Sequence, residues 1–282
     1  MLVTLSEILA PAQKHKYAVI APDFLSIGML KHYLRAAERY GAPIIASYPP
    51  LPIDRFRRFD RWIGKIRTLC QDSTVPVCLH LDHGKEVQTC LRAVAAGFTS
   101  VMIDASAFDL DLNRKMTRQT AQAARQAGVS VEAEIGHVGA NKNSMEGKAE
   151  ESNLTDPDQA AFFARETGVD ALAVSIGTLH GTYKGEPRID FERLAAINEA
   201  VDVPLVLHGG SGTGEDNLRR CVAGGICKIN VFTELIKAYL AATKAGFNPL
   251  VKGNAGFHQY NAVDKILEFY FTISGSMGVA SA

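Results

Sequence analysis

The sequence has no cysteine pattern that would bind a metal or form a redox pair. Its five cysteines are widely spaced, and no CxxC motif or Cys/His cluster occurs. An odd number of scattered thiols in apolar stretches is typical of reduced side chains packed in a core. We therefore expect reduced, packed thiols at Cys70, Cys78, Cys90, Cys221 and Cys227.

The chain also lacks the features of a membrane protein or a nucleic-acid-binding protein. No window approaches the ~18 consecutive apolar residues of a membrane span, and the first residues lack the basic and apolar regions of a secretion signal. There is no run of basic residues, and 30 basic residues balance 30 acidic ones, so no electrostatic surface for nucleic acid is evident. We expect a cytoplasmic protein without membrane or nucleic-acid partners.

The composition is that of a folded globular protein. Apolar residues make up 47% of the chain and charged residues 21%, which disfavours long disordered tails. A chain of 282 residues exceeds the usual domain length, but single α/β barrels reach this size. We expect one domain over residues 1–282, with a C-terminal helical extension over about 247–282 and a frayed end at the final GSMGVASA.

Short apolar runs alternate with amphipathic helical stretches along the chain. Eight such runs predict a (β/α)8 TIM barrel, with an open doubly wound sheet as the alternative. The expected strands are 17–21, 43–47, 75–81, 100–103, 130–134, 171–175, 204–207 and 226–230. The helical stretches include 27–40, 85–96, 114–127, 158–167, 190–200 and 215–223.

Two connections are longer than such a barrel requires. Segment 177–187 is one of them. Segment 136–157 is the other, and it is polar and rich in Gly, Asn and charge. That composition is typical either of disordered surface or of a mobile lid over a site. We expect a long mobile loop over 136–157.

Polar side chains occur at or just after the ends of the expected strands. In a TIM barrel these strand ends meet on one face, where active sites lie. The sequence therefore predicts a ring of polar groups at one mouth of the barrel. Its members are Asp82, His83, Asp104, Glu134, His180, His208 and Asn230.

Three of the histidines in this ring, His83, His180 and His208, are each followed by glycine. A glycine at that place lets the backbone approach a metal or ligand closely. Each histidine alone is more often structural, but three imidazoles with an open fourth position describe a catalytic zinc site. With a metal on His83, the adjacent Asp82 can serve as general acid/base. We expect His80, two residues earlier, to point into packing.

Two turns after the last two strands have the character of a phosphate site. Segment 207–212 reads LHGGSG and segment 228–233 reads KINVFT. Backbone N–H groups and helix N-termini at these two barrel positions favour a phosphate dianion. Ser211 and Thr233 add hydroxyl donors. One Gly-rich turn alone only caps a helix in many proteins, so the evidence lies in the pair.

The motifs are similar to those of a known enzyme family. LHLDHGKE (79–86), SVMIDAS (100–106), SVEAEIG (130–136), DALAVSIGTLHG (170–181), VPLVLHGGSG (203–212) and KINVFTEL (228–235) occur in the family's order. They resemble class II, metal-dependent ketose-bisphosphate aldolases, nearest the tagatose- and fructose-bisphosphate branch. The likeness covers residues 1 to about 245.

The resemblance implies a TIM-barrel lyase that cleaves a ketose phosphate to dihydroxyacetone phosphate and an aldehyde. It implies zinc on the three histidines and Asp82 as the proton donor. It further implies that Asp104 and Glu134 hold a second divalent or monovalent cation or support the first, and that the protein forms a homodimer or homotetramer. The implied dihydroxyacetone phosphate site comprises Gly181, Gly209, Gly210, Ser211, Asn230, Val231, Phe232 and Thr233.

The chain departs from the family pattern on the aldehyde side. Asp23 stands where the family usually has Asn, Pro49 replaces a Ser or Thr, and Phe232 replaces a small or acidic residue. Where relatives place an acid after a Gly pair, this chain has Lys142, which cannot act as a carboxylate base; Glu146 would substitute if the loop shifts. The substrate is thus either a 1,6-bisphosphate or a ketose 1-phosphate with an unusual distal group.

Two other functions fit the same residues. Three histidines and an aspartate also suit a metal-dependent hydrolase on the same barrel, although the paired phosphate turns disfavour it. The altered loop and Asp23 are compatible with a catalytically impaired phosphosugar-binding relative. Formation of dihydroxyacetone phosphate by the purified protein separates both from an aldolase.

Lys142 provides the first test, because its ammonium group is suited to bind an anionic group on the aldehyde half. We expect Lys142→Ala to reduce turnover or affinity with anionic aldehydes in steady-state kinetics. Unchanged turnover and affinity for every anionic aldehyde tested would remove Lys142 from the site.

Overall fold

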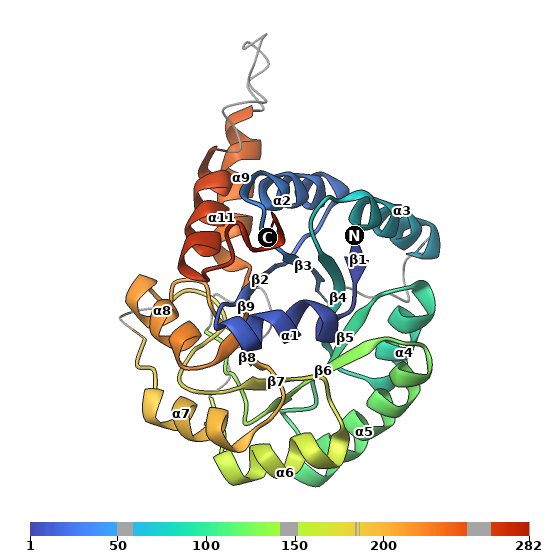
Figure 1. Cartoon of the computed structure of the whole chain (residues 1–282), viewed down its shortest axis with the longest axis vertical. Helices are drawn as coiled ribbons and strands as arrows, with labels where there is room; N and C mark the ends of the chain where they lie inside the picture. The colour runs from blue at the N-terminus through green and yellow to red at the C-terminus, as the bar shows by residue number, and fades with distance from the viewer. Residues whose placement is uncertain (50–58, 142–151, 184, 186, 247–260, 282) are drawn as a thin grey trace.

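Eight parallel strands form a closed ring with helices around it (Figure 1). The computed structural model describes residues 1–49, 59–141, 152–183, 185, 187–246 and 261–281. The strands of the ring are β2 (Val19–Pro22), β3 (Ile44–Tyr48), β4 (Val77–Gly84), β5 (Ser100–Ile103), β6 (Ser130–Ile135), β7 (Ala171–Val174), β8 (Leu205–Leu207) and β9 (Ile226–Val231). Parallel ladders run in chain order from β3 to β9 and from β9 to β2. A parallel bridge between Asp23 and Ser47 then joins β2 to β3.

The predicted TIM barrel is therefore confirmed, and the open doubly wound sheet is not formed. All eight expected strands are present, and β4 continues three residues past its expected end at Leu81 to Gly84. The helices that follow the ring strands are α2 (Ile27–Tyr40), α3 (Phe59–Asp72), α4 (Val87–Ala96), α5 (Leu110–Gln126), α6 (Pro157–Thr167), α7 (Phe191–Ala200), α8 (Glu215–Ala223) and α9 (Thr233–Gly246).

Local capping fixes where these helices begin and end. At α2 the Ser26 side chain accepts a hydrogen bond from the Met29 N–H, and Gly41 ends the helix in the left-handed region at φ 56°. At α6 Asp156 caps the N-terminus and Pro157 occupies the first turn. None of the helices in the described ranges has the length and apolar character that a membrane crossing requires.

A helix before the first ring strand covers the amino-terminal end of the barrel. Helix α1 (Leu5–His15) lies across the near opening of the ring in Figure 1. Thr4 and Glu7 form a capping box at its start. Its Leu5 and Leu9 are fully buried and pack with interior side chains of the ring, such as Val19. The short strand β1 (Leu2–Val3) pairs with β4 beside it. The polar strand ends therefore lie at the opposite mouth.

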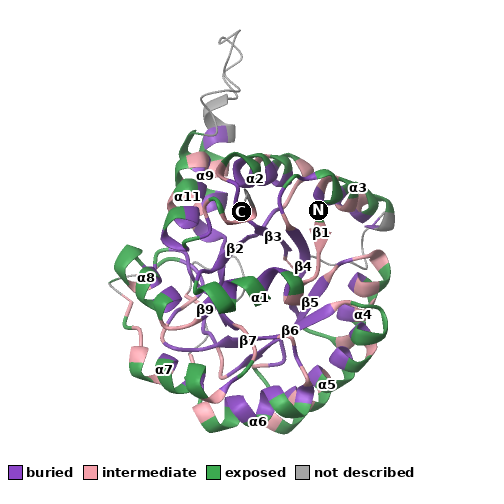
Figure 2. Cartoon of the chain, in the orientation of Figure 1, coloured by how far each residue is buried: buried purple, intermediate pink, exposed green. Residues whose placement is uncertain are grey.

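The barrel has an apolar layer inside the ring and another between the ring and the helices. Figure 2 shows buried strands and helices that are exposed on their outer faces. Cys78 and Cys227 belong to the inner layer, whereas Cys70, Cys90 and Cys221 belong to the outer one. All five thiols are free and buried, which confirms the prediction of reduced, packed cysteines.

The expectation of a frayed C-terminus is wrong. Helix α11 (Asn261–Ile273) is followed by a turn in which Ser274 and Ser276 are fully buried and then by the 3-10 helix η2 (Val279–Ser281). The Gly278 N–H donates to the Tyr40 carbonyl oxygen at 2.9 Å, and the Ala280 N–H donates to the Gly41 carbonyl oxygen at 2.9 Å. The small residues of this tail show no helix or strand periodicity, so the sequence did not indicate a regular structure. The tail is held in place by its hydrogen bonds to the C-terminal end of α2. Segment 247–260 of the expected extension lies outside the described residues.

Ending the chain at Gly275 should reveal what the tail contributes. The two backbone hydrogen bonds to Tyr40 and Gly41 and the buried Ser276 would be among the losses, which should lower the free energy of unfolding by about 2 kcal/mol or more and Tm by several degrees. Calorimetry would measure both values. Lys265→Ala, an exposed change on α11, is the control and should have little effect. An unchanged Tm in the shortened chain would show that the tail adds no stability.

Candidate metal centre

The end of β4 places an acid and an imidazole side by side at the mouth of the barrel. Successive residues of a regular strand point to opposite faces, but the register of β4 shifts between Leu81 and Gly84. His83 adopts a left-handed backbone conformation with φ 44°, which is strained for a residue other than glycine. As a result both Asp82 and His83 are buried, and the Asp82 Oδ2 atom lies 3.8 Å from the His83 Nε2 atom.

The glycines after His83 and His208 lie close to other protein atoms. A Cβ at Gly84 would lie 2.6 Å from the Cys90 Sγ atom and 2.7 Å from the Met102 carbonyl oxygen. A Cβ at Gly209, where φ is 70°, would lie 2.6 Å from the Leu179 carbonyl oxygen. At these two positions a side chain would collide with neighbouring segments of the barrel; the expected close approach of the backbone to a metal or ligand stays a prediction.

The three predicted histidines come together from three separate strand ends. The ring centroid of His83 lies 4.6 Å from that of His208 and 5.0 Å from that of His180, and the other pair is 5.7 Å apart. One nitrogen of each ring lies within 4.8 Å of one nitrogen of each other ring. All three side chains are buried. This spacing allows the three imidazoles to share one ion.

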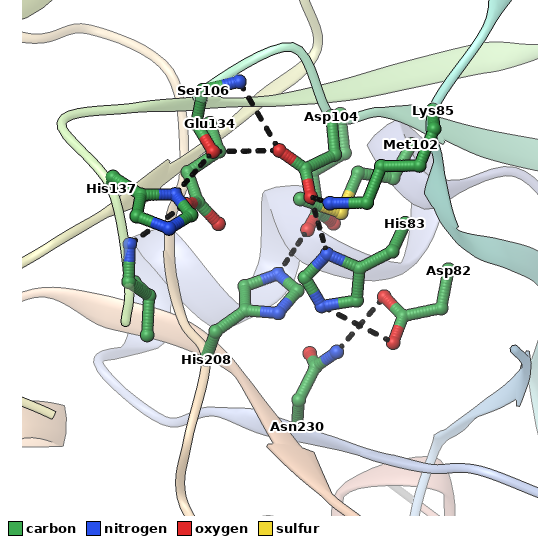
Figure 3. Close-up of polar contacts among 12 residues, drawn as sticks. Asp82, His83, Lys85, Met102, Asp104, Ser106, Glu134, His137, His208 and Asn230 are labelled. Atoms are coloured by element: carbon green, nitrogen blue, oxygen red, sulfur yellow. Dashed lines mark hydrogen bonds and ion pairs between the residues drawn. The ribbon is translucent and has the colours of Figure 1, made fainter. Parts of the chain in front are cut away.

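Carboxylates behind two of the rings fix which nitrogen faces inward. The His83 Nδ1 atom lies 2.8 Å from Asp104 Oδ2 (Figure 3). The His208 Nε2 atom lies 2.9 Å from Glu132 Oε1. Because an ionised carboxylate only accepts hydrogen bonds, each of these nitrogens carries the proton. The opposite atoms, His83 Nε2 and His208 Nδ1, are buried and have no hydrogen-bond partner in the described structure. Inward-facing nitrogens of this kind, once they carry no proton, fit a divalent metal such as zinc.

His180 is held through its backbone. Its N–H donates to the Gly139 carbonyl oxygen at 2.9 Å, and its carbonyl oxygen accepts from the Asn141 N–H at 3.0 Å. These bonds form a parallel bridge between the start of the long polar segment and the loop after β7. The segment that was expected to cover the site thus also supports one of its candidate ligands.

The described ends of the long segment 136–157 are anchored to each other. The His137 N–H donates to the Asn153 carbonyl oxygen at 2.7 Å, and the Asn153 N–H donates back at 2.9 Å. The expectation of a mobile loop remains a prediction for residues 142–151, which lie outside the described residues. Lys142 and Glu146 both fall there, so their predicted roles are not addressed by the fold.

Asp104 and Glu134 form a second group around the His83 ring. Ligand atoms of these three residues also lie within 4.8 Å of one another. The Ser106 hydroxyl donates to Asp104 Oδ1 at 2.7 Å, and the Lys85 ammonium contacts Asp104 Oδ2. The Glu134 Oε2 atom is buried and has no partner in the described part of the chain. Both acids thus lie where the sequence predicted them, next to the histidine cluster.

The charges of the site shift its pKa values in opposite directions. Burial by itself would raise the pKa of Asp82, but the neighbouring His83, His208 and Lys228 side chains lower it below its ordinary value. Burial by itself would lower the pKa of His83, but the Asp82 and Asp104 carboxylates raise it to about 10. Asp82 is therefore an ionised base at neutral pH, and its Oδ1 atom accepts a hydrogen bond from Asn230 Nδ2 at 3.1 Å.

A charged network lies beneath the histidines and was not predicted. The Lys228 ammonium lies 2.5 Å from Glu132 Oε2 and 3.1 Å from His80 Nε2, and His80 Nδ1 lies 2.8 Å from the Ser100 hydroxyl. All four side chains are fully buried. Burial and the Lys228 charge lower the pKa of His80 to about 3. His80 is buried as expected, but it takes part in a polar chain and not in apolar packing alone.

The sequence did contain a signal for this network. Glu132 lies two residues before Glu134, and Lys228 lies two residues before Asn230. Residues i and i+2 of a strand point to the same face. A charged residue two positions before a mouth residue is therefore one layer deeper in the barrel, where a charge requires a partner.

The two predicted phosphate turns lie against each other. The Phe232 N–H donates to the Ser211 hydroxyl oxygen at 3.2 Å, and α9 begins at the next residue, Thr233. The Tyr270 hydroxyl of α11 donates to the Gly210 carbonyl oxygen at 3.3 Å. A helix N-terminus beside a Gly-rich turn is suited to bind an anion. The other predicted members, Gly181, Gly209, Asn230 and Val231, are buried at the same mouth.

Asp23 lies at the end of β2 and belongs to the same mouth. Its side chain is 2% exposed, its N–H donates to the Val231 carbonyl oxygen at 3.3 Å, and it pairs with Ser47 across the closing bridge of the ring. Phe232, the other altered position, is 6% exposed and packs in the outer apolar layer. Both substitutions therefore lie on elements that border the phosphate turns.

Known sequences match nearly the whole chain. The family described as "Fructose-bisphosphate aldolase class-II" matches residues 3–278. A 6-phospho-5-dehydro-2-deoxy-D-gluconate aldolase of Bacillus subtilis (strain 168) is 36% identical over 247 residues, which cover 87% of this chain and 84% of the relative. The uncharacterized protein YdjI of Escherichia coli (strain K12) is 39% identical over 231 residues, which cover 82% of each chain.

Solved structures share the fold over the same length. The crystal structure of the YdjI aldolase from Escherichia coli K12 matches with a TM-score of 0.86 and 33% identity, covering 99% of this chain and 100% of the other. The structure of a putative fructose-1,6-biphosphate aldolase from Coccidioides immitis matches with a TM-score of 0.89 and 28% identity, covering 98% of each chain.

The raised pKa of His83 predicts how metal affinity depends on pH. Below a pKa of about 10 the imidazole holds a proton that a metal must displace. Apparent zinc affinity should therefore rise about tenfold for each pH unit between pH 6.5 and 8.5, because the proton competes less as pH rises. Competition with a chromophoric chelator would measure this slope. An affinity that does not change over that range would contradict the raised pKa of His83.

Proposed function

This chain belongs to the class II fructose-bisphosphate aldolase family, and from that premise we propose that it cleaves a ketose phosphate reversibly at the cluster of His83, His180 and His208. Enzymes of this family are carbon–carbon lyases, and the chain is an aldolase of this type. One observation carries the proposal: two buried imidazole nitrogens without hydrogen-bond partners belong to a close cluster of three histidines beside an ionised Asp82.

Asp82 is the group that moves the proton. Zinc bound to the three histidines would polarise the carbonyl and hydroxyl oxygens of the substrate. Asp82 then takes the C4 hydroxyl proton during cleavage of the C3–C4 bond and returns it during condensation. The Asn230 amide donates a hydrogen bond to Asp82 Oδ1 at 3.1 Å. This bond orients the carboxylate and leaves its Oδ2 atom to accept the substrate proton. A positioned base of this kind typically contributes about 10² to 10⁴ in rate.

The paired turns after β8 and β9 hold the phosphate of the dihydroxyacetone phosphate half. The N-terminus of α9 at Thr233 and the Ser211 hydroxyl lie together there, and both favour a dianion. Phosphate binding at this place fixes the distance between the ketone and the metal centre. Binding energy from the remote phosphate thus contributes to the reacting geometry.

The aldehyde half distinguishes this chain within the family. Asp23 and Phe232 border the site and differ from the usual residues. The Bacillus relatives are named for a phosphorylated sugar acid, whose aldol cleavage yields dihydroxyacetone phosphate and an aldehyde that carries a carboxylate. We propose that the substrate here is likewise a ketose phosphate whose distal group is not a phosphate. Of the two substrates that the sequence left open, this is the ketose 1-phosphate type.

A condensation screen tests the reaction and the aldehyde together. Purified protein with zinc and dihydroxyacetone phosphate is given glyceraldehyde, 3-oxopropanoate or glyceraldehyde 3-phosphate, and products are identified by mass spectrometry. We expect product with glyceraldehyde or 3-oxopropanoate and the lowest kcat/KM with glyceraldehyde 3-phosphate. A higher kcat/KM with glyceraldehyde 3-phosphate than with the other two aldehydes would indicate that the substrate is a ketose 1,6-bisphosphate. Release of inorganic phosphate alone would indicate a hydrolase, and binding without turnover would indicate the impaired relative.

Replacing Asp82 tests the mechanism. Asp82→Asn keeps the shape of the side chain but removes the base, so kcat should fall by about 10² to 10⁴ while the protein still takes up zinc. Asp158→Asn, an exposed change in the first turn of α6, is the control and should leave kcat unchanged. Zinc content by elemental analysis separates loss of the base from loss of the metal. Full activity in Asp82→Asn would rule out this role.

A further inference from the structure

His208 is held from the interior of the barrel by two charged residues that belong to none of the roles above. Its Nε2 atom lies 2.9 Å from Glu132 Oε1, and the Lys228 ammonium lies 2.5 Å from Glu132 Oε2. All three side chains are 0% exposed. Glu132 and Lys228 are 96 residues apart in the chain and come from β6 and β9. The pair therefore occupies the space inside the ring directly behind a candidate metal ligand.

The hydrogen bonds of this network can run in one direction only. The Lys228 ammonium is a donor without acceptor capacity. His80 Nε2, 3.1 Å away, therefore accepts, and His80 Nδ1 donates to the Ser100 hydroxyl oxygen at 2.8 Å. At its other side the ammonium donates to one oxygen of the Glu132 carboxylate. That carboxylate has its second oxygen left for His208 and can only accept there.

This polarity decides the tautomer of His208. Because Glu132 accepts, the His208 Nε2 atom carries the proton and the Nδ1 atom is bare. The Nδ1 atom is the buried nitrogen without a partner. If the carboxylate were turned or neutralised, the proton would have no preferred place on the ring, and an N–H on the inward side would oppose a cation. The Lys228 contact prevents such a turn, because it holds Oε2.

The two histidines with carboxylate partners are supported in different ways. Behind His83, the Asp104 carboxylate contacts Lys85, whose side chain is 57% exposed. Behind His208, the Glu132 carboxylate contacts a lysine that is fully buried. The exposed Lys85 ammonium adds little to the buried Asp104 because water screens it, whereas a buried carboxylate that loses a fully buried partner is strongly disfavoured. The buried pair is therefore the support on which ligand geometry depends.

We propose that Glu132 and Lys228 are positioning residues of the metal centre, which fix His208 in the tautomer that presents Nδ1 to the metal. The proposal rests on the three-histidine centre of the proposed function. Lys228 acts through Glu132, and Glu132 acts through His208, so neither touches the substrate. The pair carries no net charge, so its role is orientation and not attraction of the cation.

Zinc affinity of the metal-free protein tests the role of Glu132 without any activity assay. Glu132→Gln leaves one acceptor oxygen between two donors, so the introduced amide must turn its NH₂ group toward either His208 or Lys228. The Kd for zinc, measured by chelator competition, should rise about 10- to 100-fold, as for other outer partners of metal-bound histidines. Lys85→Met is the matched control behind His83 and should change the Kd by less than about fivefold.

A double variant tests the role of Lys228. In Glu132→Gln combined with Lys228→Met the ammonium is absent, so the amide oxygen is free to accept from His208 Nε2. Zinc should therefore bind more tightly to the double variant than to Glu132→Gln alone, by at least about fivefold. A merely structural role predicts the opposite, since two changes in a core would weaken binding further. Equal or weaker binding by the double variant would therefore overturn the role of Lys228.

The unmodified protein supplies a test that does not depend on the folding of a variant. In ¹⁵N-histidine NMR spectra of the metal-free protein, His208 should carry its proton on Nε2, whereas Glu132→Gln should show a mixture. A proton on Nδ1 in the unmodified protein, or an unchanged Kd in Glu132→Gln, would overturn the proposal. If Glu132→Gln leaves the zinc Kd unchanged, His83→Ala shows which proposal fails. An unchanged Kd in His83→Ala would mean that the metal centre itself is wrong. Loss of zinc binding in His83→Ala would mean that only the positioning role fails.

Discussion

The rest of the site depends on two imidazole nitrogens that are buried close together without hydrogen-bond partners. His83 Nε2 and His208 Nδ1 have no hydrogen-bond partner in the described structure, a condition that is costly unless a ligand satisfies it. A carboxylate behind each ring, Asp104 or Glu132, binds the other nitrogen and so turns this one toward the cluster. The barrel makes this arrangement possible because its strand ends converge, and α1 fills the opposite end with apolar side chains.

The electrostatics follow from the same crowding of charge. Carboxylates around His83 raise the pKa of its imidazole to about 10, while the surrounding cations lower the pKa of Asp82. A cation bound in the cluster would replace the extra proton of the His83 imidazole. The aspartate next to it remains ionised, which is the state that a base needs at neutral pH.

In the proposed function, the dihydroxyacetone phosphate side of the site follows the family pattern and the aldehyde side departs from it. The turns around Ser211 and Thr233 lie together as the motifs predict, whereas Asp23 and Phe232 change the border of the site. In the proposed function, the phosphate-binding side of the site fixes the reaction, because it must hold the dihydroxyacetone phosphate half of the substrate at a constant distance from the metal. The other side of the site selects the aldehyde.

The sequence by itself determined the eight strands, the order of the barrel and the residues at its mouth, because strand periodicity and strand ends are local features. It did not determine the Glu132–Lys228 pair, the bulge that turns His83 inward, or the ordered tail that bonds to Tyr40. Each of these depends on partners far apart in the chain. Burial requires every charge and backbone group to find a partner, and only the closed ring decides which partners are within reach.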